Sequence, residues 1–129
     1  MINLSYEVTM PDPVTLATDT PADSFPWGAI RWLHNSVINE GAEQTFGEVF
    51  INPGGQNPPH YHPNCEEILY VLSGTCTHTY GDESYELGPG DSIIVPEGVV
   101  HHAINKGWEP IRAIISFSSA DRQTVFLED

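Results

Sequence analysis

The chain has 129 residues, and its 4 Lys and Arg against 18 Asp and Glu give a formal net charge of −14. This length suits one globular domain, and the charge excludes nucleic acid and anionic membrane surfaces as partners because both attract clustered Lys and Arg. With no bilayer-length apolar run, no leader pattern at the start and only 2 cysteines, we expect a cytoplasmic protein with reduced thiols.

The first 29 residues differ from the rest of the chain because prolines interrupt them. A continuous helix or a central strand is incompatible with this spacing. The prolines are Pro11, Pro13, Pro21 and Pro26. We therefore expect residues 1–29 to form an extended N-terminal arm that packs on the barrel or on a dimer partner, with Leu4–Thr9 as a candidate strand.

From residue 30 onward, short apolar runs recur, and no window shows a long 3.6-residue period. The runs are rich in β-branched and aromatic residues, and the 11 Gly and 11 Pro of the chain supply turns near them. Strands are expected at Ile30–Leu33, Phe46–Ile51, Ile68–Leu72, Thr75–Tyr80, Ser84–Leu87, Ser92–Val95 and Ile111–Phe117. The pattern predicts an all-β domain over residues 30–129, either a sandwich or a small barrel.

The 6 histidines are unevenly placed, and two tight groups stand out, His60-Tyr61-His62 and His101-His102. Alternate residues of a strand face the same side, so His60 and His62 can direct two imidazoles to one point. Imidazole is a common ligand of transition metals, and a nearby carboxylate would complete a mixed nitrogen and oxygen set. Taken alone, a solvated strand surface is an equal alternative for such a histidine pair.

The spacing around these histidines is more specific than the pair itself. Residues 54–74 read GGQNPPHYHPNCEEILYVLSG, and residues 90–105 read GDSIIVPEGVVHHAIN. The glycines, histidines, glutamate, proline and asparagine of these strings resemble, at every defining position, the two motifs of the cupin superfamily. The motifs and the segment between them cover residues 54–105.

The resemblance implies a double-stranded β-helix, or jelly-roll barrel, made by one small cupin domain with its core motifs at 54–74 and 90–105. It further implies one divalent metal ion (Fe, Mn, Ni, Zn or Cu) bound inside the barrel by His60, His62, Glu67 and His101. The motif register selects Glu67 over Glu66 as the ligand. It likewise selects His101 over His102, whose side chain faces the other side of the strand.

The resemblance leaves the reaction open. A metal with four protein ligands keeps open positions for water, dioxygen or a chelating substrate. We therefore expect a metal-dependent enzyme acting on a small oxygenated metabolite, as a dioxygenase, an isomerase or a lyase of decarboxylase type. The alternative is a non-catalytic, metal-containing domain that binds or senses a small molecule, and a purely structural metal is disfavoured because structural sites are usually closed.

Candidate substrate-contacting or catalytic residues were chosen by proximity to the motifs: Arg31, Glu48, Phe50, Gln56, Tyr70 and His78. Arg31 could bind a substrate carboxylate, and a salt bridge at the rim is an equal alternative. Tyr70 is the weakest candidate because it faces opposite to Glu67 in an unbroken strand. For His78, a surface or core position is the competing interpretation.

We expect a homodimer because a small β domain must cover its outer strands, and small cupins of this kind are commonly dimers. Aromatic residues near the arm are the candidate interface anchors, with core packing as the alternative. They are Phe25, Trp27 and Trp32.

Overall fold

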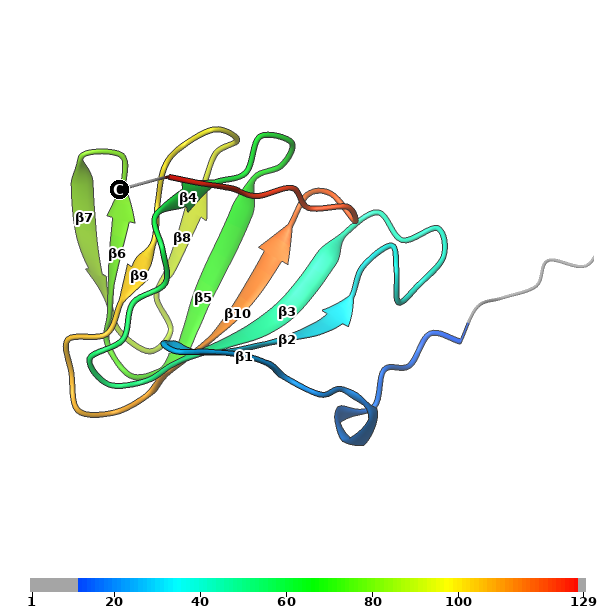
Figure 1. The fold of residues 1–129 in the computed structure, drawn as a ribbon, viewed down its shortest axis with the longest axis horizontal. Helices are drawn as coiled ribbons and strands as arrows, with labels where there is room; N and C mark the ends of the chain where they lie inside the picture. Colours follow the sequence, from blue (N-terminus) through cyan, green and yellow to red (C-terminus); the bar gives the residue numbers. More distant parts are fainter. Residues whose placement is uncertain (1–11, 128–129) are drawn as a thin grey trace, which may run out of the picture.

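β-strands dominate the computed structural model, which describes residues 12–127 (Figure 1). The short 3-10 helix η1 (Ala17–Asp19) precedes the strands. The strands are β1 (Asp23–Phe25), β2 (Gly28–His34), β3 (Thr45–Ile51), β4 (His60–Tyr61), β5 (Glu67–Ser73), β6 (Cys76–Tyr80), β7 (Glu83–Leu87), β8 (Ser92–Val95), β9 (Ala103–Ile104), β10 (Ile111–Phe117) and β11 (Val125–Phe126). The all-β jelly-roll architecture expected from the sequence is confirmed.

The strands form three antiparallel sheets. The largest has the order β1-β2-β3-β10-β5-β8, a second has the order β7-β6-β9, and β4 pairs with β11. In Figure 1 the large sheet curves along one side, and the two small sheets lie across from it. The barrel interior lies between them.

Alternate residues of the long strands explain which side chains fill this interior. In β3, β5 and β10 every second residue is buried, as period-2 geometry requires. The resulting core combines apolar residues of both sides: Val49, Ile51, Cys65, Leu69, Val71, Cys76, Leu87, Ala103, Ile111, Ala113, Ile115 and Phe117.

The end of the expected N-terminal arm forms an edge strand of the large sheet. β1 pairs with β2, with Asp23 opposite Ile30 and Phe25 opposite Gly28, so residues 23–29 belong to the large sheet. Pro21 and Pro26 flank β1 and do not interrupt it. Prolines at these positions bound a short edge strand, which the sequence pattern alone did not distinguish from an arm.

The candidate strand Leu4–Thr9 lies outside the described residues. Within residues 12–127, no helix combines the length and the apolar character needed to cross a membrane.

Candidate metal centre

The four predicted ligands converge on one point inside the barrel. One ligand atom from each of His60, His62, Glu67 and His101 lies within 4.8 Å of the others, and all four residues are buried. His60 lies on β4, Glu67 begins β5, and His101 lies two residues before the start of β9. The two sequence motifs therefore meet at a single site.

Backbone pairing brings the motifs together. His60 N donates to His101 O over 3.1 Å, and His101 N donates to His60 O over 2.8 Å, in an isolated antiparallel bridge. Gly98 N donates to His62 O over 2.9 Å, and Glu67 lies opposite Val95 in the β5–β8 pair. The ligand positions are thus set by strand pairing.

The ring orientation of each histidine is set by a backbone carbonyl that contacts its Nδ1. The acceptors are Pro58 O for His60 (2.7 Å), Gln123 O for His62 (2.9 Å) and Val99 O for His101 (2.8 Å). A carbonyl oxygen only accepts, so each Nδ1 carries the proton and donates. In the neutral form of each ring, the Nε2 lone pair is then free for a metal.

Glu67 supplies the observation that tests whether a metal fits. Its Oε1 lies 3.1 Å from His62 Nε2 and 2.9 Å from His101 Nε2. A carboxylate oxygen and an imidazole lone pair are both acceptors, so these contacts are favourable only with a cation or a proton between them. Three imidazole nitrogens and one carboxylate form a donor set that suits a divalent transition metal.

Burial and charge set the protonation of the cluster. Burial lowers the pKa of His60 to about 4. Burial opposes ionisation of Glu67, but hydrogen bonding to His101 and His62 outweighs it and holds the pKa of Glu67 well below its usual value. Burial also opposes protonation of His101, and Glu67 outweighs it to raise the pKa of His101. An ionised carboxylate therefore faces the imidazoles, and a metal competes with a proton for the space between them.

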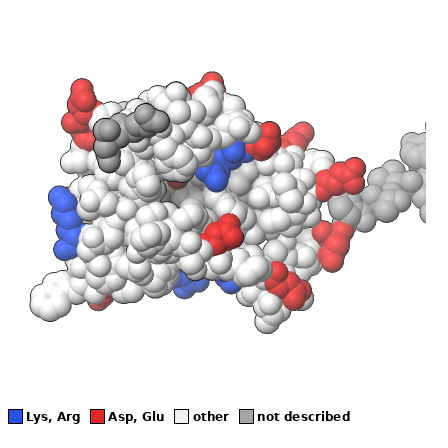
Figure 2. Space-filling model, viewed as in Figure 1, with Lys and Arg blue, Asp and Glu red and all other residues white. Residues whose placement is uncertain are grey.

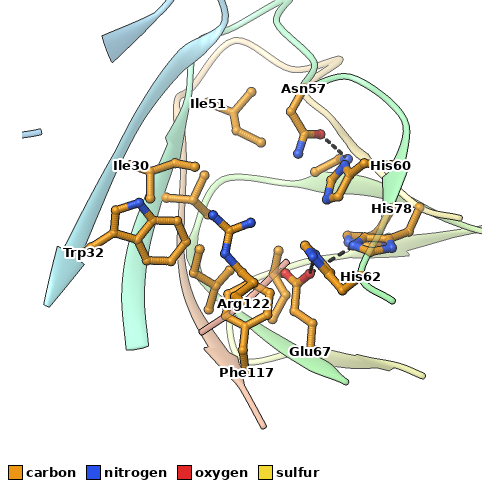
Figure 3. A pocket seen from close by; sticks show the side chains of 15 residues that line it. Ile30, Trp32, Ile51, Asn57, His60, His62, Glu67, His78, Phe117 and Arg122 are labelled. Atoms are coloured by element: carbon orange, nitrogen blue, oxygen red, sulfur yellow. Dashed lines mark hydrogen bonds and ion pairs between the residues drawn. The ribbon is translucent and has the colours of Figure 1, made fainter. Parts of the chain in front are cut away.

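His78 is the one sequence-predicted catalytic candidate that lines this cavity. It is buried, and burial lowers the pKa of its imidazole. Its Nδ1 donates to Thr79 O over 2.8 Å, and its ring stacks on His101 with centroids 5.7 Å apart. His78 is thus a neutral imidazole packed against a ligand (Figure 3).

Arg31 and Glu48 lie on the outer face of the large sheet, contrary to their selection as cavity residues. They are opposite each other in the β2–β3 pair and form a 3.4 Å ion pair. In β3 the buried residues are Thr45, Gly47, Val49 and Ile51, so Glu48 and Phe50 face outward. Of the two interpretations of Arg31, the structure therefore supports the salt bridge and not the binding of a substrate carboxylate.

Tyr70 and Gln56 also lie away from the cavity. Tyr70 is 42% exposed on the outer side of β5, as its register against Glu67 predicts. Gln56 is exposed, and its Oε1 lies 3.1 Å from His102 Nε2. These residues are close to the candidate ligands in the sequence, but their side chains do not line the cavity.

Arg122 lines the cavity, and the sequence analysis missed it. Its guanidinium carbon lies 4.5 Å from the ring centroid of Trp32 and 5.2 Å from that of Phe117. Figure 3 shows it extending between Trp32 and Glu67. The available signal was the scarcity of basic residues, since the chain has only 4 Lys and Arg.

Two adjoining spaces that share lining residues make up the site. The inner cavity, at the four candidate ligands, has a volume of about 50 Å³, and the outer chamber has about 180 Å³. Both are lined by Ile30, Trp32, Asn57, His60 and Arg122. Trp27 and Phe25, expected as interface anchors, stack on each other at 4.9 Å and line the outer chamber.

Comparison with known proteins agrees with this geometry. The family model described as "Cupin domain" matches residues 47–117. Germin-like protein 4-1 of Oryza sativa subsp. japonica is 39% identical over 85 residues, which are 58% of this chain and 34% of that protein. The rhicadhesin receptor of Pisum sativum is 39% identical over 72 residues, covering 52% of this chain and 33% of that protein. The chain thus spans about a third of the length of these relatives.

Solved structures show the same architecture. A structure of oxalate oxidase matches with a TM-score of 0.73 and 26% identity, covering 81% of this chain and 57% of that one. A double-stranded β-helix protein from Klebsiella pneumoniae matches with a TM-score of 0.74 and 19% identity, covering 92% of this chain and 99% of that one. The second likeness concerns the fold alone.

Proposed function

The chain belongs to the cupin family, and from that premise we propose that it is a metal-dependent enzyme acting on a small oxygenated metabolite inside the barrel. The observation that carries this proposal is the convergence of His60, His62, Glu67 and His101 beside an open cavity. A closed tetrahedral cage would favour a structural metal, whereas this site adjoins space for a further ligand.

The size of the cavity supports a catalytic site over a structural one. The inner volume of about 50 Å³ exceeds the roughly 10–15 Å³ of cavity volume needed to hold one water, so water or a donor atom of a substrate fits beside the four residues. A divalent metal held there would supply Lewis-acid polarisation of a substrate carbonyl or carboxylate and, where redox active, electron transfer. The apolar residues Ile30, Trp32 and Phe117 line the cavity beside the four candidate ligands.

His78 is the residue we propose for proton handling. Because its Nδ1 donates to Thr79 O, its Nε2 is an acceptor when the ring is neutral. Burial lowers the pKa of His78 and so favours the neutral ring. A neutral imidazole beside the ligand cluster is suited to accept a proton from a bound substrate.

Among the reaction types considered, we propose oxidoreductase chemistry first. One solved structure at 26% identity is that of an oxalate oxidase, and its match covers 81% of this chain and 57% of that one. Isomerase and lyase reactions on a similar site are the alternatives that the assay must separate.

The test is metal content and turnover of the purified protein loaded separately with Fe(II), Mn(II), Ni(II), Cu(II) or Zn(II). Keto acids, diketones, phenols and sugar derivatives are supplied while O₂ uptake and product formation are followed. We expect turnover with at least one metal, loss of metal and turnover in His101→Ala, and retention of both in His102→Ala. Ligand binding without turnover under every metal would overturn the enzyme and support the non-catalytic binding domain.

The homodimer and the cytoplasmic location stay proposals. Phe25 and Trp27 line the outer chamber, so they support the homodimer less than the sequence suggested. Light scattering coupled to size-exclusion chromatography measures the oligomeric state directly, and a mass of one chain would overturn the dimer.

A further inference from the structure

Arg122 is a partly buried cation that forms no close ion pair in the described part of the chain, although the charge of Glu67 acts on it and raises its pKa against the lowering by burial. Arg31 and Arg112 both form ion pairs with Glu48, at 3.4 and 3.0 Å. The ion pairs found within residues 12–127 include none to Arg122, although the chain has 18 Asp and Glu. Within residues 12–127 this guanidinium therefore has no ion-pair partner, and it can bind an added anion.

The hydrogen bonding of Arg122 leads to the same conclusion. The structure gives its side chain one hydrogen bond, from Nη1 to Thr124 Oγ1 at 2.5 Å. A guanidinium has five N–H donors in a planar fork that matches a carboxylate. Packing over Trp32 and Phe117 fixes the plane of the group and does not use those donors.

The charged residues that line the two spaces determine the electrostatic potential around Arg122. Glu67, a candidate metal ligand, is the one carboxylate among the lining residues that the structure describes. Arg122 and a divalent metal would therefore make this interior attract anions, although the whole molecule has a net charge of −14. Figure 2 shows the hollow at the centre of this face with a basic group and an acidic group beside it, and further acidic side chains around the periphery.

The outer chamber has a different chemistry from the inner cavity. Four aromatic side chains line it, those of Phe25, Trp27, Trp32 and Phe126. Aromatic faces bind flat apolar groups by stacking or edge-to-face contact. The chamber of about 180 Å³ is smaller than the roughly 300 Å³ at which sites for drug-sized ligands begin, so its occupant is compact.

We propose that Arg122 binds the carboxylate of the substrate while the aromatic chamber holds a flat apolar group attached to it. Arg122 lines both spaces, so one molecule can contact the metal side, the guanidinium and the aromatic rings together. The substrate class is then a small aryl or conjugated monocarboxylate. That this molecule is a substrate rests on the proposed function, whereas the preference for binding an aryl carboxylate does not.

The probes for this proposal are 3-phenylpropanoate, its neutral amide 3-phenylpropanamide, and propanoate, which lacks the ring. Binding to the Zn(II)-loaded protein is measured by calorimetry and by tryptophan fluorescence. Trp27 and Trp32 line the chamber, whereas Trp108 is 96% exposed and provides a background signal. We expect 3-phenylpropanoate to bind at least roughly tenfold more tightly than either other probe, because each lacks one of the two recognised groups.

The variant Arg122→Gln should lower affinity for 3-phenylpropanoate by roughly tenfold to a hundredfold and leave the amide nearly unchanged. Arg122→Lys, which keeps the charge but loses the fork, should retain part of the affinity. Arg31→Gln is the matched control because Arg31 is paired on the outer face, and it should bind like the wild type. Metal content and the melting curve verify that each variant is folded.

Equal binding of 3-phenylpropanoate and its amide, or equal binding by the wild type and both Arg122 variants, would overturn the proposal and leave Arg122 as a packing residue. Carboxylate selectivity that depends on Arg122, found without turnover, would support this proposal while overturning the enzyme. If the protein converts other compounds at a rate that substitution of Arg122 does not change, the role of Arg122 in substrate binding is overturned, and the proposed enzymatic function is not.

Discussion

His101 and His102 are adjacent in the chain yet point to opposite sides of it. His101 Nε2 lies 2.9 Å from Glu67 Oε1 inside the barrel, whereas His102 Nε2 lies 3.1 Å from Gln56 Oε1 near the surface. The antiparallel bridge between His60 and His101 sets this register. A slip of one residue would exchange the two side chains and remove a ligand from the cluster.

Glu66 and Glu67 form a second pair of neighbours with opposite orientations, and they provide a matched test of the ligand set. Glu67 is buried in the cluster, whereas Glu66 is exposed. We expect Glu67→Gln to lose the metal on dialysis because the site loses its only anionic donor. Glu66→Gln should keep about one metal ion per chain by elemental analysis, as the wild type does. Metal retention in both variants would contradict the assignment.

Removing the metal should destabilise the fold. A ligand that binds only the folded state, present at a hundred times its dissociation constant, stabilises by about 2.7 kcal/mol. For a domain of this size that corresponds to a fall in melting temperature of roughly 10 °C after chelation. Scanning calorimetry of metal-loaded and chelated protein measures the shift. Glu67→Gln should melt at one temperature with or without added metal, and an equally large metal-dependent shift in that variant would contradict the prediction.

The sequence predicted the longer strands from local patterns and the four ligands from the resemblance to the cupin motifs. Apolar runs and turn residues mark the longer strands, and the intervals between His60, His62, Glu67 and His101 match those motifs. All four converge as the resemblance implied.

Local sequence spacing did not predict which face of the sheet the side chains of the other strands occupy. Arg31 and Glu48 were selected by proximity, but the face they occupy depends on which residues of β2 and β3 are buried, and that follows from the pairing of the whole sheet. Only the folded chain shows that these two residues neutralise each other outside the barrel.

Arg122 was missed for a different reason. It lies in a segment without periodicity after β10, and its position depends on the pairing of β11 with β4, where Val125 lies opposite Tyr61. Contacts between residues so far apart in sequence leave no local pattern. The pairing also brings Gln123 O to His62 Nδ1, so this returning segment orients a ligand as well.

A comparison of two glycines with similar φ angles distinguishes the stability cost of backbone strain from that of steric overlap. Gly74 has φ +81° and Gly90 has φ +91°, both in the left-handed region. A Cβ at Gly74 would lie 2.5 Å from Pro110 O, whereas a Cβ at Gly90 would meet nothing within 4 Å. We expect Gly90→Ala to lower the free energy of unfolding by about 1–2 kcal/mol and Gly74→Ala to lower it further. Guanidinium denaturation measures both values, and equal losses would contradict the steric argument.

The two cysteines offer a probe of barrel opening. Both are buried, and burial raises the pKa of Cys76 to about 12 and that of Cys65 above its ordinary value. Because the thiolate is the reactive form, Cys76 at pH 8 would have a thiolate fraction of about one in ten thousand even if a reagent reached it. We therefore expect the folded protein to react slowly with a thiol-specific reagent such as 5,5′-dithiobis(2-nitrobenzoate), and both thiols to react within minutes in denaturant.

Metal should slow this labelling further. If the reagent reaches Cys76 only when the strands separate, its rate follows the population of the open barrel, and a ligand that binds only the closed state reduces that population. Adding Zn(II) to the chelated wild type should therefore lower the labelling rate, whereas the rate in Glu67→Gln should not change. Zn(II) bound directly by the thiols would protect both proteins equally, so protection of the variant as well would show that the slowing does not come from the four-residue site.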